Sequence, residues 1–203
     1  MVIGITGGSG CGTSSVGKIL EEAGWGFIDC DAVYHGLLAS DAELKDALVS
    51  RFGEGILSPE GLVNRRALGK IVFSSEQALS DLNEITHGRI TEKVIELISE
   101  CEKVDIAIEA VELLESGMKT LCTAVIGVLA NRENRINRIM IRDAMSRADA
   151  EKRIDAQRSD GYYLSRCDRC VENNGTVEEL GEKILSLVKE IDTQRFSSIA
   201  RNN

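Results

Sequence analysis

A glycine-rich segment at residues 4–15 holds the residue types that bind phosphate. It reads GITGGSGCGTSS, follows an apolar start and precedes a helical pattern. Glycines let consecutive backbone N–H groups face one anion, and the N-terminus of the following helix adds further N–H groups. The spacing G-x-x-x-x-G-K-[ST] runs from Gly7 to Ser14, which places a hydroxyl where a Mg²⁺ ligand is expected. The segment therefore predicts a site for a nucleoside triphosphate and Mg²⁺.

One residue departs from that pattern, because Thr13 stands where the lysine is expected. A threonine offers one neutral hydrogen bond in place of a positive charge, and charge-assisted bonds are roughly twice as strong as neutral ones. The backbone N–H groups and the Ser14 hydroxyl do not depend on that lysine. We therefore expect the phosphates of ATP to bind without an ammonium group, at Gly8, Gly10, Cys11, Gly12, Thr13, Ser14 and Ser15.

Short apolar runs alternate with helical patterns along the chain. The runs lie at residues 2–6, 26–29, 104–108, 121–130 and 170–172. Uninterrupted apolar strands are typical of a parallel sheet that is covered on both faces. The sequence thus predicts an α/β fold with a five-stranded parallel sheet covered by helices. A mostly helical insertion is expected at 32–100, and an arginine-dense helical stretch follows the fourth strand.

Composition and charge exclude several classes of function. The 203 residues suffice for one domain, and a net charge of −9 with no block of lysine or arginine argues against a nucleic-acid partner. We find no run of about 18 apolar residues and no signal peptide, so we expect a cytoplasmic protein that does not contact a membrane. The six cysteines are scattered along the chain, and in a cytoplasmic protein we expect them to be reduced thiols. The lone Cys167-x-x-Cys170 is better explained as coincidence than as a zinc or redox site.

Several short segments together carry a family resemblance. In family order they are Thr6–Gly12, Asp29–Asp31, Asn64–Leu68, Leu82–Asn83 with His87, Leu114–Gly117, Arg138, Arg142–Asp143, Arg153, Gln157 and Asn173–Gly175. The chain resembles dephospho-CoA kinases over nearly its whole length. It departs from their pattern at Thr13, at His35 in place of an arginine, at Gly88 in place of a proline and at Tyr163 in place of a common lysine.

The resemblance implies a fold, a reaction and a division of the chain. The family has a P-loop, nucleoside-monophosphate-kinase-like fold, and it transfers the γ-phosphoryl group of ATP to the ribose 3′-hydroxyl of dephospho-CoA. The ligands implied are ATP, Mg²⁺ and dephospho-CoA. The implied architecture is one domain with a core at residues 1–31, 101–131 and 166–195, a substrate-side insertion at 32–100 and a lid at 132–165. We expect a monomer or a small homo-oligomer.

The resemblance also implies roles for individual side chains. Asp31 would accept the proton of the hydroxyl group, Arg142 would close on the phosphates, and Arg138 would be a further ATP contact. Asp29 would join Ser14 near Mg²⁺ as an outer contact. The residues implied on the substrate side are His35, Arg65, Asn83, His87 and Glu115.

Two other functions stay open at this point. The first is a homologue that binds ATP or a CoA-like ligand without turnover, which the departures at Thr13, His35 and Tyr163 suggest. The second is a kinase of another small hydroxylated substrate, because the acceptor pocket within the insertion at 32–100 is not readable from the sequence. Turnover of dephospho-CoA by the purified protein distinguishes these functions from the kinase reaction.

Overall fold

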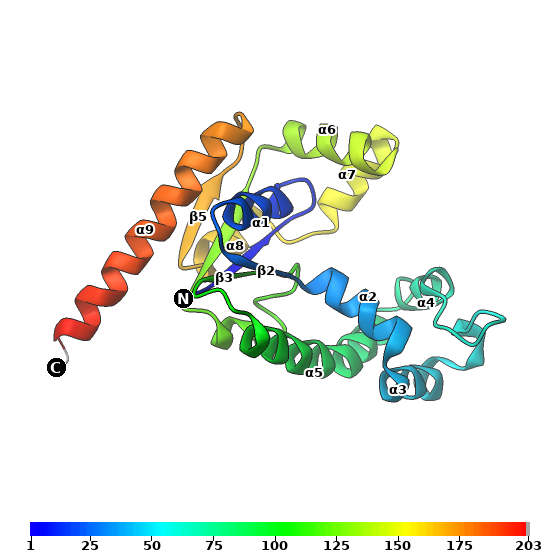
Figure 1. Ribbon diagram of the computed structural model, residues 1–203. Coiled ribbons are helices and arrows are strands. Elements are labelled where there is room, and N and C mark those ends of the chain that lie inside the picture. Colours follow the sequence, from blue (N-terminus) through cyan, green and yellow to red (C-terminus); the bar gives the residue numbers. More distant parts are fainter. Residues whose placement is uncertain (202–203) are drawn as a thin grey trace. The chain divides into compact units, whose positions relative to one another are not determined.

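Five strands form one sheet in the computed structural model, which describes residues 1–201 (Figure 1). They are β1 (Val2–Gly7), β2 (Gly26–Asp29), β3 (Ile106–Glu109), β4 (Ala124–Leu129) and β5 (Arg169–Glu172). The order across the sheet is β2-β3-β1-β4-β5. Strand β1 pairs in parallel with β3 and β4, and β4 pairs in parallel with β5. The predicted α/β fold with a parallel five-stranded sheet is confirmed.

Two strands begin later than the apolar runs predict. The run at 104–108 becomes β3 only from Ile106, because Val104 lies 87% exposed before the strand. The run at 121–130 becomes β4 only from Ala124, because Met118–Leu121 form a short 3-10 helix. Strand β3 also extends one residue beyond its predicted end, to Glu109. That extra residue lies at the carboxyl end of the strand, where parallel sheets place functional groups.

The chain forms two compact units. The first combines residues 1–27 with the chain from Cys101 onward, and the second spans Ile28–Glu100. The helices of the first unit are α1 (Thr13–Glu22), α6 (Arg132–Asp143), α7 (Arg147–Asp155), α8 (Asp160–Arg166) and α9 (Val177–Arg201). In the described part of the chain, none of the helices has the length and apolarity that a membrane span requires.

Apolar side chains on one face of the sheet form a core cluster of the first unit with α1 and α9. Ile3 and Ile5 of β1 and Val128 of β4 are fully buried, in one cluster with Val16 of α1 and Ile184 of α9. Full burial of such side chains contributes about 1.5–3 kcal/mol each. Because this cluster fixes both β1 and α1, it also fixes the two ends of the glycine-rich loop between them.

The second unit is helical, as predicted for residues 32–100. Its helices are α2 (Cys30–Ser40), α3 (Ala42–Phe52), α4 (Arg65–Val72) and α5 (Glu76–Glu100). The last of these, α5, is one continuous helix of 25 residues. Helix α5 packs on the other three, and the buried cluster between them comprises Leu38, Leu44, Leu48, Ile56, Leu68 and Val72.

Polar bonds fix how α3 and α5 meet in the second unit. The Leu44 N–H donates to Asp41 Oδ1 at 2.9 Å, which caps the start of α3. Arg89 Nη2 of α5 donates to Asp41 Oδ2 at 2.6 Å. The capping bond and the Arg89 guanidinium both lower the pKa of the Asp41 carboxyl group. The Asp41 carboxylate thus caps α3 and binds Arg89 of α5.

Gly17 allows α1 to approach β2, because a β-carbon at this position would stand 2.3 Å from Phe27 Cε2. We expect Gly17→Ala to lower the free energy of unfolding by about 1–3 kcal/mol, the usual cost of overpacking. Urea denaturation measures it. Gly36→Ala in α2 is the control: no atom lies within 4 Å of the added carbon, so helix propensity should raise stability by up to about 1 kcal/mol. Equal effects at both positions would contradict this packing.

Candidate active site

The glycine-rich loop joins the carboxyl end of β1 to the start of α1. Its backbone turns tightly, with the N–H of Cys11 donating to the carbonyl of Gly8 at 3.0 Å. Gly10 and Gly12 have φ values of +78° and +97°, in the left-handed region that side chains disfavour. Glycine is therefore needed at both positions for the loop to present its N–H groups together with those of the first turn of α1.

Side chains from outside the loop bind its carbonyl oxygens. Arg138 Nη1 of α6 donates to the carbonyl of Gly10 at 3.1 Å. Asn173 follows β5, and its Nδ2 donates to the carbonyl of Cys11 at 2.8 Å. The N–H of a trans peptide points away from its carbonyl oxygen, so the second bond turns the N–H of Gly12 to the opposite side from Asn173. Arg138, a predicted ATP contact, thus binds the loop through the carbonyl oxygen of Gly10.

Ser9 is held by two side chains that lie far away in the sequence. Its N–H donates to Gln157 Oε1 at 2.9 Å, and Gln157 Nε2 donates to Ser9 Oγ at 2.9 Å. Arg135 Nε of α6 donates to the carbonyl of Ser9 at 3.0 Å. The peptide groups on both sides of Ser9 therefore have fixed orientations before any ligand binds.

Glu109 binds both hydroxyl groups at the start of α1. Thr13 Oγ1 donates to Glu109 Oε1 at 2.5 Å, and Ser14 Oγ donates to the same oxygen at 2.9 Å. Glu109 ends β3, which lies next to β1 in the sheet, so the carboxyl end of β3 meets the start of α1. The contact places an acidic side chain beside the two residues whose hydroxyl groups were predicted to face phosphate and Mg²⁺.

Arg142 and Arg153 share the carboxylate of Asp143. Arg142 donates to it through Nε at 2.8 Å and Nη2 at 2.9 Å, and Arg153 binds the second carboxylate oxygen. These two guanidinium groups lower the pKa of Asp143 to about 2. The same bond, with a smaller contribution from the charge of Glu109, raises the pKa of Arg142. Arg142 therefore carries a permanent charge whose field reaches the Glu109 carboxylate.

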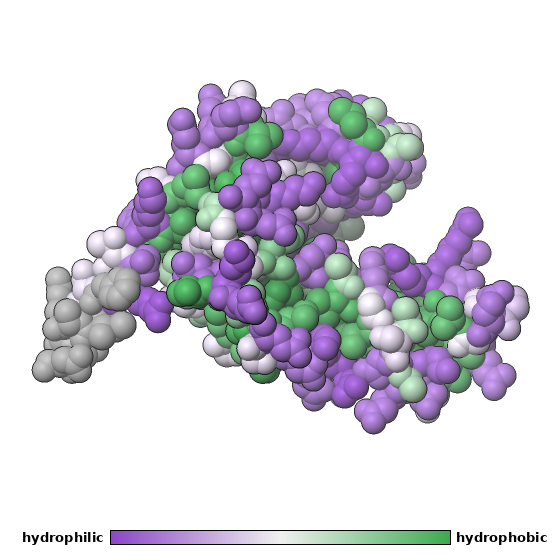
Figure 2. All heavy atoms as spheres, viewed as in Figure 1, coloured by the Kyte–Doolittle hydropathy of each residue, from purple (hydrophilic) through white to green (hydrophobic). Residues whose placement is uncertain are grey.

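Other arginines of the 132–158 stretch form ion pairs on the surface. Arg132 binds Asp155 and Arg147 binds Glu133, all with side chains about half or more exposed. Figure 2 shows that the visible face of α6 and α7 is largely hydrophilic. Exposed pairs of this kind contribute little to stability. We therefore assign these arginines to the solvated surface, and only those that face the loop or Asp143 to the site.

Glu115 binds an aromatic side chain of the arginine-rich stretch. Tyr162 Oη donates to Glu115 Oε1 at 2.5 Å. The guanidinium carbons of Arg158 and Arg166 lie 5.2 Å and 4.2 Å from the centre of the Tyr162 ring. Next to it, Tyr163, which departs from a common lysine, is buried, and burial raises the pKa of its hydroxyl group to about 12. Position 163 therefore supplies no charge to the site.

In the second unit, two predicted residues lie on one side of α2. Asp29 caps this helix, with its Oδ1 accepting from the N–H groups of Asp31 and Ala32 at 2.9 Å and 3.1 Å. Asp31 is exposed in the first turn, and half-buried His35 follows four residues later, which places both on the same face. The ring of His35 lies 5.9 Å from that of Tyr34.

The remaining substrate-side residues lie on α4 and α5. Arg65 begins α4 after an Asn64 cap, and its charge acts to lower the pKa of Tyr34, against a larger rise from burial. Asn83 and His87 are half-buried and one turn apart on α5, the helix that packs on α2. The structure thus groups Asp29, Asp31, His35, Arg65, Asn83 and His87 in the second unit, and the loop residues, Glu115, Arg138 and Arg142 in the first.

Comparisons with known proteins assign the family. The dephospho-CoA kinase family model matches residues 1–179. The dephospho-CoA kinase of Geobacter sulfurreducens is 35% identical over 198 residues, covering 96% of this chain and 98% of that protein. The chain belongs to the dephospho-CoA kinase family. This assignment is the basis for interpreting the residues described above.

Solved structures agree with this family assignment. A dephospho-CoA kinase from Campylobacter jejuni superposes with a TM-score of 0.67 at 26% identity, covering 96% of this chain and 98% of that one. A Thermus thermophilus protein superposes with a TM-score of 0.79 at 28% identity, covering 94% and 97% of the two chains. The matched residues include both compact units, in agreement with the predicted P-loop kinase fold.

Sequence reasoning missed four residues that contact the loop of this dephospho-CoA kinase family member: Glu109, Arg135, Gln157 and Asn173. A signal was available for Glu109, because an acidic residue directly follows an apolar strand and the carboxyl ends of parallel strands lie together. Gln157 and Asn173 belong to segments that carry the resemblance but had no role assigned. Arg135 had no local signal, since it is one of seven arginines in that stretch.

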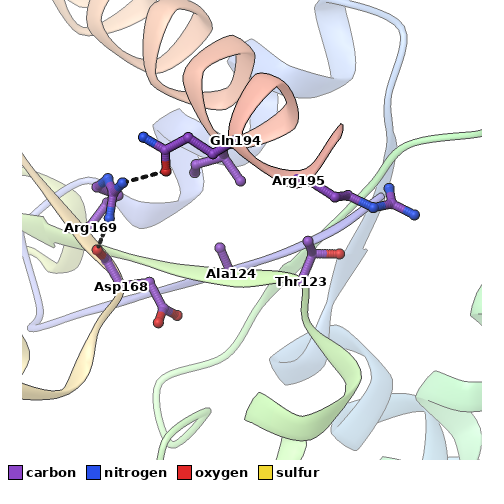
Figure 3. Close-up of a pocket in the computed structure, with 7 residues that line it drawn as sticks. Thr123, Ala124, Asp168, Arg169, Gln194 and Arg195 are labelled. Carbon is purple, nitrogen blue, oxygen red and sulfur yellow. Dashed lines mark hydrogen bonds between the residues drawn. The ribbon is translucent and has the colours of Figure 1, made fainter. Parts of the chain in front are cut away.

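A separate hollow of about 340 Å³ lies at the end of the strands opposite to the glycine-rich loop (Figure 3). Thr123 precedes β4 and Arg169 begins β5, so the hollow is at the amino ends of these strands, whereas the loop follows the carboxyl end of β1. Arg169 Nη2 donates to Gln194 Oε1 of α9 at 2.7 Å across it. This hollow therefore lies away from the glycine-rich loop.

The bond between Asp143 and the two arginines should make stability depend on acid. A carboxyl group with a depressed pKa stabilises the folded state above its unfolded pKa, about 3.9, and loses that contribution as pH falls through its folded pKa. With a folded pKa of about 2, the difference in unfolding free energy between wild type and Asp143→Asn should be full near pH 6 and about half as large at pH 3. Urea denaturation at both pH values measures it. A difference that is the same at both would show that Asp143 is not bound as described.

Proposed function

We propose that this chain phosphorylates the ribose 3′-hydroxyl of dephospho-CoA with ATP to give coenzyme A. The reaction forms a bond from the 3′-oxygen to the γ-phosphorus and breaks the bond from that phosphorus to the β–γ bridging oxygen. The hydroxyl proton passes to a base, and ADP leaves. Membership of the dephospho-CoA kinase family favours this reaction over a binding protein without turnover and over a kinase of another acceptor.

The loop with its fixed carbonyls is the observation that supports ATP binding most directly. Phosphoryl transfer depends on positioning and on stabilising charge, with little covalent chemistry left to the protein. Here the orientation of the loop's peptide groups is fixed, because Arg138 and Asn173 bind the carbonyl oxygens of Gly10 and Cys11. The N–H groups of the loop and of the first turn of α1, at Gly8, Gly10, Gly12, Thr13 and Ser14, are proposed to bind the β- and γ-phosphates. The N–H groups of Cys11 and Ser15, which were predicted as further ATP contacts, instead donate to the carbonyls of Gly8 and Gly12 at 3.0 Å and 3.1 Å.

The donor set beside the loop suits Mg²⁺. Ser14 Oγ and Glu109 Oε1 are both oxygen ligands, and they lie 2.9 Å apart, next to the proposed phosphate site. Mg²⁺ takes oxygen ligands and is usually held by one or two protein groups plus substrate phosphates. When bound, Mg²⁺ neutralises charge on the phosphates. We propose Ser14 and Glu109 as its near contacts, and Asp29 as an outer one.

Further side chains are proposed, from the family resemblance, to act on the acceptor and on the transferred group. Asp31, exposed at the start of α2, is the proposed base for the 3′-hydroxyl proton. Arg142, held in its charged form by Asp143, is proposed to bind the transferred phosphoryl group. The proposed contacts to the acceptor are His35, Arg65, Asn83, His87 and Glu115.

Asp31→Asn tests the proposed base. The amide cannot take up the proton, so kcat for coenzyme A formation should fall by about 10²–10⁴-fold, the usual contribution of a positioned base, while the Kd for ATP changes less than about twofold. Chromatographic detection of coenzyme A from purified protein, ATP, Mg²⁺ and dephospho-CoA measures the first, and calorimetry the second. Asp46→Asn on α3 is the matched control and should keep full activity. Failure of the wild type to phosphorylate dephospho-CoA would remove the proposed function itself.

Glu109→Gln tests the cation site. Loss of the carboxylate should raise the Mg²⁺ concentration for half-maximal activity by about tenfold or more, because a neutral amide binds a hard cation more weakly. Glu43→Gln, at a side chain 85% exposed on α3, is the matched control. A Mg²⁺ requirement that is the same in both variants would assign Glu109 to holding Thr13 and Ser14 only.

A further inference from the structure

Arg135 is a buried guanidinium group directly against the phosphate-binding loop. The residue is 6% exposed, and its Nε donates to the carbonyl of Ser9 at 3.0 Å. Its Nη2 donates to Gln157 Oε1 at 2.9 Å, the same oxygen that accepts from the N–H of Ser9. The carboxylate of Asp160, half-exposed in the first turn of α8, lies 3.8 Å from Nη1. One buried cation thus touches the loop and has a partly solvated counter-ion.

Two loop glycines leave room for Arg135. A β-carbon on Gly8 would stand 2.5 Å from Arg135 Nη2, so the guanidinium lies against the Gly8 backbone. A β-carbon on Gly10 would stand 2.7 Å from the backbone oxygen of Arg135. Helix α6 therefore packs on the loop at this residue. Side chains at positions 8 and 10 would push α6 and its charge away.

The position of this charge matters because Thr13 provides none. An arginine guanidinium stays protonated in proteins, and a buried charge is screened by salt much less than an exposed one. Its influence on the loop is visible at Cys11: burial raises the pKa of this thiol, and the Arg135 charge is the largest effect that opposes the rise. Asp160 acts on Cys11 in the opposite direction, by a smaller amount.

We propose that Arg135, through its bonds to the outer side of the loop, supplies the positive potential for polyphosphate binding that a lysine at position 13 would otherwise supply. The inference rests on the proposed ATP site. Arg135 touches no phosphate in this arrangement, so it is a positioning residue and a source of field. If the two positions serve the same purpose, the fields of their charges add at the polyphosphate, so a lysine at position 13 should restore the affinity that Arg135→Gln loses.

Calorimetric titration with Mg²⁺-free ATP and with inorganic tripolyphosphate tests this in four proteins: wild type, Arg135→Gln, Thr13→Lys and the double variant. Arg135→Gln should raise both Kd values by about tenfold. Thr13→Lys should restore most of the affinity that Arg135→Gln loses, so that the double variant binds within about threefold of wild type. A double variant as weak as Arg135→Gln, or a Kd for Arg135→Gln within twofold of wild type, would overturn the proposal. Absence of ATP binding by the wild type would instead remove the ATP site on which it rests.

Three further variants separate charge from packing. Arg135→Lys keeps the charge and loses the paired bonds, so its Kd should stay within about threefold of wild type; a loss as large as that of Arg135→Gln would overturn the role of charge. Asp160→Asn removes the counter-ion and leaves Arg135 in place, so it should tighten binding about two- to threefold. No tightening would also count against the proposal, and this variant serves if Arg135→Gln fails to fold. Arg132→Gln, an exposed arginine of the same helix, should leave binding unchanged.

Discussion

The orientation of a few peptide groups between β1 and α1 is the constraint on which the rest of the site depends. Backbone N–H groups bind an anion only if their carbonyl partners point elsewhere, and here Ser9, Gly10 and Cys11 have their carbonyls bound by Arg135, Arg138 and Asn173. These side chains come from α6 and from the end of β5, which are separated from the loop by more than a hundred residues. The sheet order that places β4 next to β1 and β5 next to β4 is therefore a requirement of the binding chemistry.

The same arrangement explains how a loop without its lysine still suits a highly charged ligand. Positive charge is present in the structure, but it lies on α6, behind the loop at Arg135 and Arg138 and farther along at Arg142. Negative charge lies at Glu109, whose carboxylate accepts from the hydroxyl groups of Thr13 and Ser14. A divalent cation bound at this position would balance the charge of that carboxylate. Asp143 keeps Arg142 charged and fixed. The proposed binding, cation and transfer roles thus belong to separate side chains.

Local patterns in the sequence were sufficient for the sheet and for the loop. Gly10 and Gly12 follow from a motif of a few residues. The contacts that hold the loop were not predictable in this way. The bond between Ser9 and Gln157 joins residues 148 positions apart, and the one between Ser9 and Arg135 joins residues 126 apart. Such pairs depend on how the whole first unit packs, and no spacing rule along the chain specifies them.

A crystal structure with Mg²⁺ and a non-hydrolysable ATP analogue tests the central claim most directly. We expect the N–H groups of Gly10, Gly12 and Ser14 within hydrogen-bond distance of phosphate oxygens, with the bonds to the Ser9, Gly10 and Cys11 carbonyls unchanged. Phosphates bound by a rearranged loop, with those carbonyls released and turned inward, would contradict the account.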